Sequence, residues 1–266
     1  ETVGVHLRYW PNWYPLYCND RDTLLRYNQD DNGIHKYYDA ANYEEWIKVI
    51  HDNIEAALRL KPEYLVWHVA DATLEECYTY NFEHSDLEIV AAAAKVFNKA
   101  AKDLPEEILV LFENLWWPGL TLKNKEAVKL FFELIEHKNS GIMLDTGHLM
   151  NTNWNLETEN QGIDYILQVA DSLGEYKNYI KGIHLNCSLS GAYMKSLEHK
   201  APAKYEMMDV MHYICQIDRH RPFSSPRVRE ISDFINPMYV THELYYSDFL
   251  DLEKKIRQQM KTYQEN

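Results

Sequence analysis

Gly-Ile-Met-Leu-Asp-Thr-Gly-His, residues 141–148, is the stretch that decides the fold. In it a short apolar run stops at Asp145, and His148 follows in the next turn. Three other apolar runs, rich in β-branched residues or Leu, also stop on a side chain that can bind a metal ion: Glu113, His184 and Glu243. Each interval between these ends can hold a helix, so strands and helices are expected to alternate around a parallel sheet. A (β/α) barrel places all its strand C-termini on one face, where the active site lies.

The rest of the chain extends this pattern. Apolar runs predict strands at residues 3–7, 64–69, 108–112, 142–144, 180–185 and 239–242. Helical periodicity predicts helices at residues 43–60, 86–104, 124–137, 164–173, 228–235 and 250–263. Residues 9–40 are rich in Tyr and Trp and are expected to form a loop region. We therefore predict an α/β fold of the TIM (β/α)8 type, as a single domain over residues 1–266.

The predicted strands are fewer than the eight of a complete barrel. Either residues 1–60 and 205–217 contain further strands, or one or two N-terminal βα units are absent from this chain. We favour the second interpretation, because the run that ends at His6 already has the form of an interior strand carrying a ligand.

Further candidate metal ligands come after strands or in loops. His6 and His68 end two apolar runs, and Asp218 and His220 lie in Ile-Asp-Arg-His-Arg-Pro-Phe, residues 217–223. The candidate set is then His6, His68, Glu113, Asp145, His148, His184, Asp218, His220 and Glu243. One ion takes about four to six ligands, so this set suits two or three ions. Clustered ions can activate a water and stabilise both sides of a phosphoryl displacement.

Other side chains are candidates for substrate contact, each with a structural alternative. Trp116 and Trp117 follow a ligand-bearing strand and could stack on a sugar or base, or could form a packed loop. Trp10 has the same two alternatives. Arg219 could contact a phosphate or carboxylate, or form an ordinary surface ion pair. His242 precedes Glu243 and should face the opposite side of its strand as a structural residue. The other histidines are expected on surfaces or helices: His35, His51, His84, His137, His199 and His212.

Composition narrows the class of protein. The net charge of −14 disfavours general binding to DNA, because phosphate contacts dominate nucleic-acid affinity. The sequence has no apolar stretch near the roughly 18 residues that span a bilayer, so no membrane association is expected. The four cysteines are widely spaced, which favours a reduced, cytoplasmic enzyme and argues against a thiolate zinc site.

The ordered ligand set resembles that of the xylose isomerase-like TIM barrels and, within them, the endonuclease IV branch, also called AP endonuclease family 2. The resemblance covers roughly residues 1–250 as an ordered series. The motifs that carry it are Glu-Asn at 113–114, Asp-Thr-x-His at 145–148, His-Leu-Asn at 184–186 and Asp-Arg-His at 218–220. Two segments are longer than this family pattern leads us to expect: the one between His6 and His68, and the one between His184 and Asp218.

This resemblance implies a metal-dependent enzyme of one of two kinds. The first is a phosphoester hydrolase similar to endonuclease IV, with two or three Zn²⁺ ions that Glu113 and Glu243 ligate or bridge. The second is an isomerase or epimerase of a small sugar or sugar phosphate. It would hold one Mn²⁺, Mg²⁺, Co²⁺ or Zn²⁺, use Glu113 and Glu243 as an acid/base pair, and hold a substrate oxygen with His148. The number of candidate ligands favours the hydrolase, whereas the net charge and the aromatic segment favour the sugar enzyme. A non-catalytic binding barrel is a third alternative.

Overall fold

The computed structural model of the protein describes residues 2–204 and 207–264, which form two compact units. Unit 1 takes in the chain up to residue 113 together with 117–120 and 126–141. Unit 2 takes in 114–116, 121–125 and the chain from residue 142 onward. Residues 205–206, within one segment proposed to hide a strand, lie outside the described residues. The single-domain organisation stays a prediction.

Three parallel strands form the sheet of unit 1: β1 (Gly4–His6), β2 (Tyr64–His68) and β3 (Leu109–Glu113). They pair in sequence order, and the register places His68 directly beside Glu113. The predicted strands in this half of the chain are thus confirmed to within about a residue at each end.

Long amphipathic helices cover the strands of unit 1. They are α4 (Tyr43–Leu58), α6 (Asp86–Ala100) and α7 (Lys125–Leu134), and a short helix, α5 (Leu74–Thr79), precedes α6. Ser85 begins α6 through a reciprocal capping box with Glu88, which satisfies backbone N–H groups that the first turn leaves unpaired. The core is aromatic: Phe97 lies edge-on to Phe112 with ring centroids 4.9 Å apart. The sequence had predicted these three long helices from their apolar periodicity.

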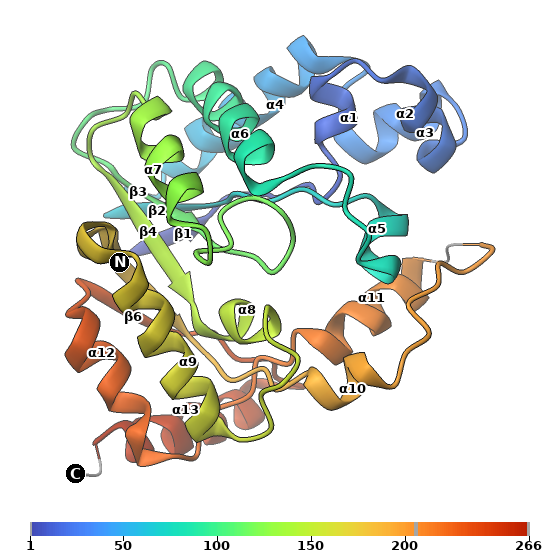
Figure 1. Cartoon of the computed structure of the whole chain (residues 1–266). Coiled ribbons are helices and arrows are strands. Elements are labelled where there is room, and N and C mark those ends of the chain that lie inside the picture. Colours follow the sequence, from blue (N-terminus) through green and yellow to red (C-terminus); the bar gives the residue numbers. More distant parts are fainter. Residues whose placement is uncertain (1, 205–206, 265–266) are drawn as a thin grey trace. The chain divides into compact units, whose positions relative to one another are not determined.

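Residues 9–40 correct the expectation of a loop region. They contain three helices, α1 (Tyr14–Tyr17), α2 (Arg21–Asn28) and α3 (Asp31–Tyr38), grouped near α4 in blue in Figure 1. Helices of only four to eight residues are too short for a clear periodic pattern. Asp20 and Asp30 begin α2 and α3 by accepting backbone N–H groups with their side chains.

The strands of unit 2 are also parallel. β4 (Ser140–Asp145) enters the unit at residue 142 and pairs with β5 (Ile180–Leu185), which pairs with β6 (Tyr239–His242). The register places Asp145 beside His184. The described residues contain six strands, as predicted, and residues 207–217 form a helix rather than a further strand.

Helices connect the strands of unit 2. α8 (Thr146–Asn151) begins directly at the end of β4, and α9 (Glu159–Ser172) leads to a 3₁₀ helix, η1 (Gly174–Tyr179). The long connection from β5 to β6 contains α10 (Gly191–Lys195), α11 (Met207–Ile217), η2 (Pro226–Val228) and α12 (Arg229–Ile235). Figure 1 shows α10 and α11 in orange. α13 (Phe249–Gln264) follows β6. None of the helices within the described ranges is both long and apolar enough to cross a membrane.

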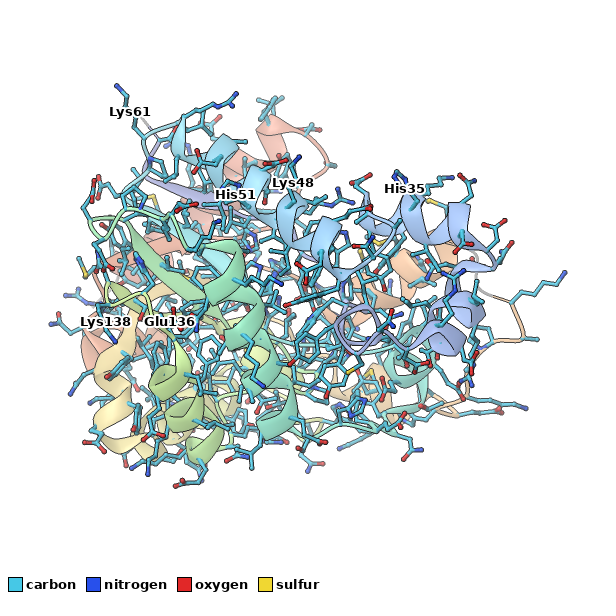
Figure 2. The ribbon with its side chains drawn as sticks, turned by 90° about the horizontal axis from the view of Figure 1, so that it is seen from above. His35, Lys48, His51, Lys61, Glu136 and Lys138 are labelled. Carbon is cyan, nitrogen blue, oxygen red and sulfur yellow. The ribbon has the colours of Figure 1, made fainter. Side chains whose placement is uncertain are left out.

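Two histidines outside the strand ends agree with the expected surface positions. His35 on α3 is exposed and His51 on α4 is partly exposed, and Figure 2 shows both on the helical surface of unit 1 with Lys48. His137 does not agree: it is buried, and its Nε2 lies 2.8 Å from the Ile108 carbonyl oxygen. This hydrogen bond links the segment after α7 to the residue that precedes β3.

Candidate metal centre

In unit 2, three candidate ligands converge at the carboxyl ends of the strands. Asp145 ends β4, His184 lies near the end of β5, and Glu243 follows β6. One donor atom of each lies within 4.8 Å of a donor atom of the other two. His184 Nδ1 and Glu243 Oε2 are 2.7 Å apart. Asp145 and His184 are buried, whereas Glu243 is partly exposed, so the group contains one carboxylate that solvent can reach.

A second group in unit 2 is built around Asp218. Its Oδ2 lies 2.7 Å from His220 Nε2 and 3.4 Å from His148 Nε2. Asp145 joins this group as well, since donor atoms of Asp145, His148 and His220 also lie within 4.8 Å of one another. All four side chains are buried. Asp145 thus belongs to both groups.

The hydrogen bonds of the two histidines fix the orientation of their rings. His148 Nδ1 lies 2.9 Å from the Asn114 carbonyl oxygen, and His220 Nδ1 lies 3.0 Å from the Glu243 carbonyl oxygen. Because a carbonyl oxygen only accepts, each Nδ1 carries the proton and donates it. Each ring therefore points its Nε2, the nitrogen that would bind a metal, toward Asp218. A ring nitrogen fixed on a backbone carbonyl is typical of metal-binding histidines.

Asp218 and His220 also set each other's ionisation. Burial by itself would raise the pKa of Asp218, but the ion pairs and hydrogen bonds with His148 and His220 hold it well below its ordinary value. Burial lowers the pKa of His220, and the hydrogen bond and charge of Asp218 outweigh this and raise it to about 9. A cation bound here would take the place of the histidine protons, because a metal ligand must be deprotonated.

Two buried oxygen atoms in this region point to a missing cationic or hydrogen-bonding partner. Within the described residues, Asp218 Oδ1 and Asn186 Oδ1 are shielded from solvent and accept no hydrogen bond. A buried polar atom without a partner is unfavourable by about 1–3 kcal/mol and calls for an explanation. The donors around Asp218 are carboxylates and imidazoles, which are ligands of zinc and other divalent cations, so the residues present fit such an ion.

Unit 1 holds a separate group. Glu113, fully buried at the end of β3, places Oε2 2.9 Å from His6 Nε2 and 3.3 Å from His68 Nε2. His6 Nδ1 lies 2.9 Å from the Leu7 carbonyl oxygen, the same arrangement as in the two histidines of unit 2. Tyr9 packs on His68 with ring centroids 4.7 Å apart, and its hydroxyl donates to the Ala70 carbonyl oxygen.

The candidate substrate residues have different surroundings. Trp116 is buried and lies edge-on to His148, with ring centroids 5.3 Å apart. Trp117 is buried in unit 1, where the loop is held by a bridge between Ala70 and Gly119. Gly119 has φ of +137°, and a Cβ there would lie 2.2 Å from the Val69 carbonyl oxygen, so only glycine fits. The aromatic pair therefore belongs to a tightly packed loop.

Trp10 and Arg219 each make hydrogen bonds to backbone carbonyl oxygens of the protein. Trp10 is 3% exposed, donates through Nε1 to the Tyr37 carbonyl oxygen, and lies edge-on to Trp46. Its burial favours the packing alternative over contact with a substrate. Arg219 is partly exposed, and its Nε donates to the Gln216 carbonyl oxygen.

Several residues around the centre were not among the candidates drawn from the sequence. Ser188 accepts the backbone N–H groups of Arg219 and His220, and Tyr245 stacks on the ring of His220 at 4.5 Å. Asn186 donates to Asp145 Oδ2 at 2.8 Å. Asn186 lies in the His-Leu-Asn motif and was therefore visible in the sequence, whereas Ser188 and Tyr245 carry no local signal.

Comparison with known proteins agrees with this architecture. No curated protein matches the chain. Among solved structures, a D-tagatose 3-epimerase-like protein is 16% identical, with 98% of this chain and 76% of that chain covered and a TM-score of 0.52. A sugar phosphate isomerase/epimerase from Parabacteroides distasonis ATCC 8503 is 9% identical, with 97% and 68% covered and a TM-score of 0.45. The model of the xylose isomerase-like TIM barrel family matches residues 35–264. The chain therefore belongs to the xylose isomerase-like TIM barrel family, and its α/β fold is of the TIM-barrel type.

Proposed function

We propose that this protein is a divalent-metal-dependent enzyme that acts on a sugar-like or phosphoester substrate. The observation that carries the proposal is the arrangement around Asp218: two histidines donate Nδ1–H to backbone carbonyls and direct Nε2 toward one buried carboxylate. Such an arrangement prepares nitrogen and oxygen donors for a cation. The second group, Asp145 with His184 and Glu243, offers donors of the same chemistry.

The number of donors supports a hydrolase with two or three zinc ions, similar to endonuclease IV. Asp218, His220, His6 and His68 would have no ligand role in an enzyme that holds one ion on Asp145, His184 and Glu243. Bound divalent cations would lower the pKa of a water and stabilise charge on phosphoryl oxygens. The partly exposed Glu243 carboxylate could accept a proton from that water. Glu113 at the end of β3 is proposed for the same face, since a TIM barrel places its strand C-termini together.

A sugar isomerase or epimerase is the second candidate, and the comparisons favour it over the hydrolase. Two of the similar structures are described as a D-tagatose 3-epimerase-like protein and a sugar phosphate isomerase/epimerase. In this reaction Glu113 and Glu243 would move a proton between neighbouring carbons, and His148 would hold a substrate oxygen. His148 would then need to exchange its contact with Asp218 for one with the substrate.

Metal content separates these candidates. The protein would be purified without chelator or histidine tag and analysed for elements per chain. A content of about two or three zinc ions supports the hydrolase and justifies assays on abasic DNA and small phosphodiesters. About one ion of manganese, cobalt, magnesium or zinc supports the sugar enzyme and justifies a screen of keto sugars. A chain that takes up no divalent ion would contradict both and leave a non-catalytic barrel.

Two matched histidine variants locate the ions. His220→Ala removes a donor of the Asp218 group, and we expect it to lose one ion if several are bound. His242→Ala is the control, because His242 Nδ1 accepts from Gln259 of α13 and takes no part in either group. Equal metal loss in the two variants would show that the Asp218 group holds no ion of its own. The cytoplasmic location expected from the cysteines stays a prediction.

A further inference from the structure

The segment that carries Asp218 and His220 has an unusual backbone. His220 has φ of +41°, in the left-handed region that non-glycine residues rarely adopt. Such a residue persists only when its surroundings over-determine it, and it often marks a functional site. The conformation turns the chain so that Nε2 of His220 reaches the carboxylate two residues before it, at 2.7 Å.

One hydroxyl holds this turn. Ser188, only 1% exposed, accepts the backbone N–H of Arg219 at 2.9 Å and that of His220 at 3.2 Å. Directly beside it, Cys187 and Arg221 form an antiparallel bridge with backbone hydrogen bonds of 2.8 and 3.1 Å. The backbone bridge pairs residue 187 with residue 221, and the Ser188 hydroxyl adds hydrogen bonds to residues 219 and 220.

The same hydroxyl lies against the helix that carries His148. A Cβ on Gly147 would stand 2.8 Å from Ser188 Oγ and 1.9 Å from Asn186 Oδ1. The absence of a side chain at Gly147 lets the end of β5 approach α8 this closely. Ser188 thus lies between the two elements that supply His148 and His220 to Asp218.

We propose that Ser188 is the positioning residue for the metal group around Asp218. It fixes the left-handed turn at His220 so that His220 and His148 direct Nε2 to the same carboxylate. This inference rests on the proposed function, because it assumes that the Asp218 group binds a cation. It assigns Ser188 no contact with substrate and no role at Asp145, His184 and Glu243.

The test is Co²⁺ binding to the chelator-treated full chain, followed by visible absorption and calorimetry. Wild type is expected to bind in more than one step, and His220→Ala identifies the step that belongs to the Asp218 group. Ser188→Ala should weaken that step by about 10- to 100-fold, the effect typical of residues that orient metal ligands, and leave the other step unchanged. Ser190→Ala is the matched control: Ser190 is also buried, but its hydroxyl donates to Asn151.

The outcomes distinguish the inference from the function on which it rests. If Ser188→Ala binds Co²⁺ as wild type does, the proposed role of Ser188 is wrong. The same holds if Ser188→Ala and Ser190→Ala weaken both binding steps equally. In either case the proposed function stands. No Co²⁺ binding by wild type overturns the proposed function and this inference together.

A measurement on the unmodified protein keeps the inference testable if Ser188→Ala does not fold. The amide protons of Arg219 and His220 should exchange slowly with solvent, as slowly as that of Cys187 in the neighbouring bridge. Fast exchange at residues 219 and 220 with slow exchange at 187 would mean that the hydroxyl does not hold the turn.

Discussion

Asp71 should make the folded protein less stable as pH rises. This carboxyl follows β2, is 4% exposed, and accepts the backbone N–H groups of Trp13 and Tyr14 at 2.7 and 2.8 Å. Burial raises the pKa of Asp71 from 3.8 to about 8, against the lowering effect of these two hydrogen bonds. The folded chain therefore keeps a proton at neutral pH that the unfolded chain releases.

The sign and size of the effect follow from proton linkage. The folded state binds more protons than the unfolded state between the two pKa values, so the stabilising contribution is complete below about pH 4 and is lost as pH approaches 8. Each pH unit in this window changes the free energy of unfolding by about 1.4 kcal/mol. Over the whole window the loss amounts to about 6 kcal/mol.

Asp71→Asn removes the titration and keeps an acceptor oxygen for Trp13 and Tyr14. Urea unfolding of both proteins, followed by circular dichroism at half-unit steps from pH 4.5 to 8, measures the difference. We expect the variant to gain stability relative to wild type at each step upward. Asp20→Asn is the control, since hydrogen bonds to Thr23 lower the pKa of that exposed carboxyl, which therefore stays ionised throughout this range and should leave the slope unchanged. Parallel stability curves for wild type and Asp71→Asn would refute the reasoning.

Three further substitutions test packing and the candidate metal centre. Gly147→Ala places a Cβ 1.9 Å from Asn186 Oδ1, and we expect lower thermal stability together with weaker Co²⁺ binding in a calorimetric titration. Tyr245→Phe removes a hydroxyl 3.5 Å from Asp218 Oδ2 but keeps the ring. It should alter stability by less than about 1 kcal/mol in urea unfolding and change metal affinity by less than about tenfold. Phe112→Ala opens a cavity in the aromatic core of unit 1 and should lower the free energy of unfolding by about 3–5 kcal/mol.

The local patterns of the sequence predicted the strands and most long helices. The apolar runs before Asp145 and before His184 form neighbouring strands, in which Asp145 lies beside His184. The period of two predicts a structural role for His242, and its Nδ1 accepts a hydrogen bond from Gln259 of α13. These features depend on a few consecutive residues, so they can be inferred without the fold.

Other features depend on contacts between distant segments and could not be inferred. The helices within residues 9–40 form around buried aromatic side chains, with Trp13 stacked on Trp46 at 6.1 Å. His137 is buried because Ile108 offers it a carbonyl oxygen. Ser188 gains its importance from a turn some thirty residues later in the chain, and nothing in the residues around it indicates this.

Asp145 has two structural roles, as the N-cap of α8 and as a member of both candidate ligand groups, and a substitution could separate them. Its Oδ1 accepts the backbone N–H of His148 at 2.6 Å and so begins α8, while the same carboxylate belongs to both candidate ligand groups of unit 2. The folded helix holds this carboxylate in place before any ion arrives, so little side-chain freedom remains to be lost on loading. Asparagine begins helices as well as aspartate does, but it lacks the charge. A lineage that acquired Asp145→Asn should therefore keep this helix and its fold even if it could no longer hold an ion between the two groups.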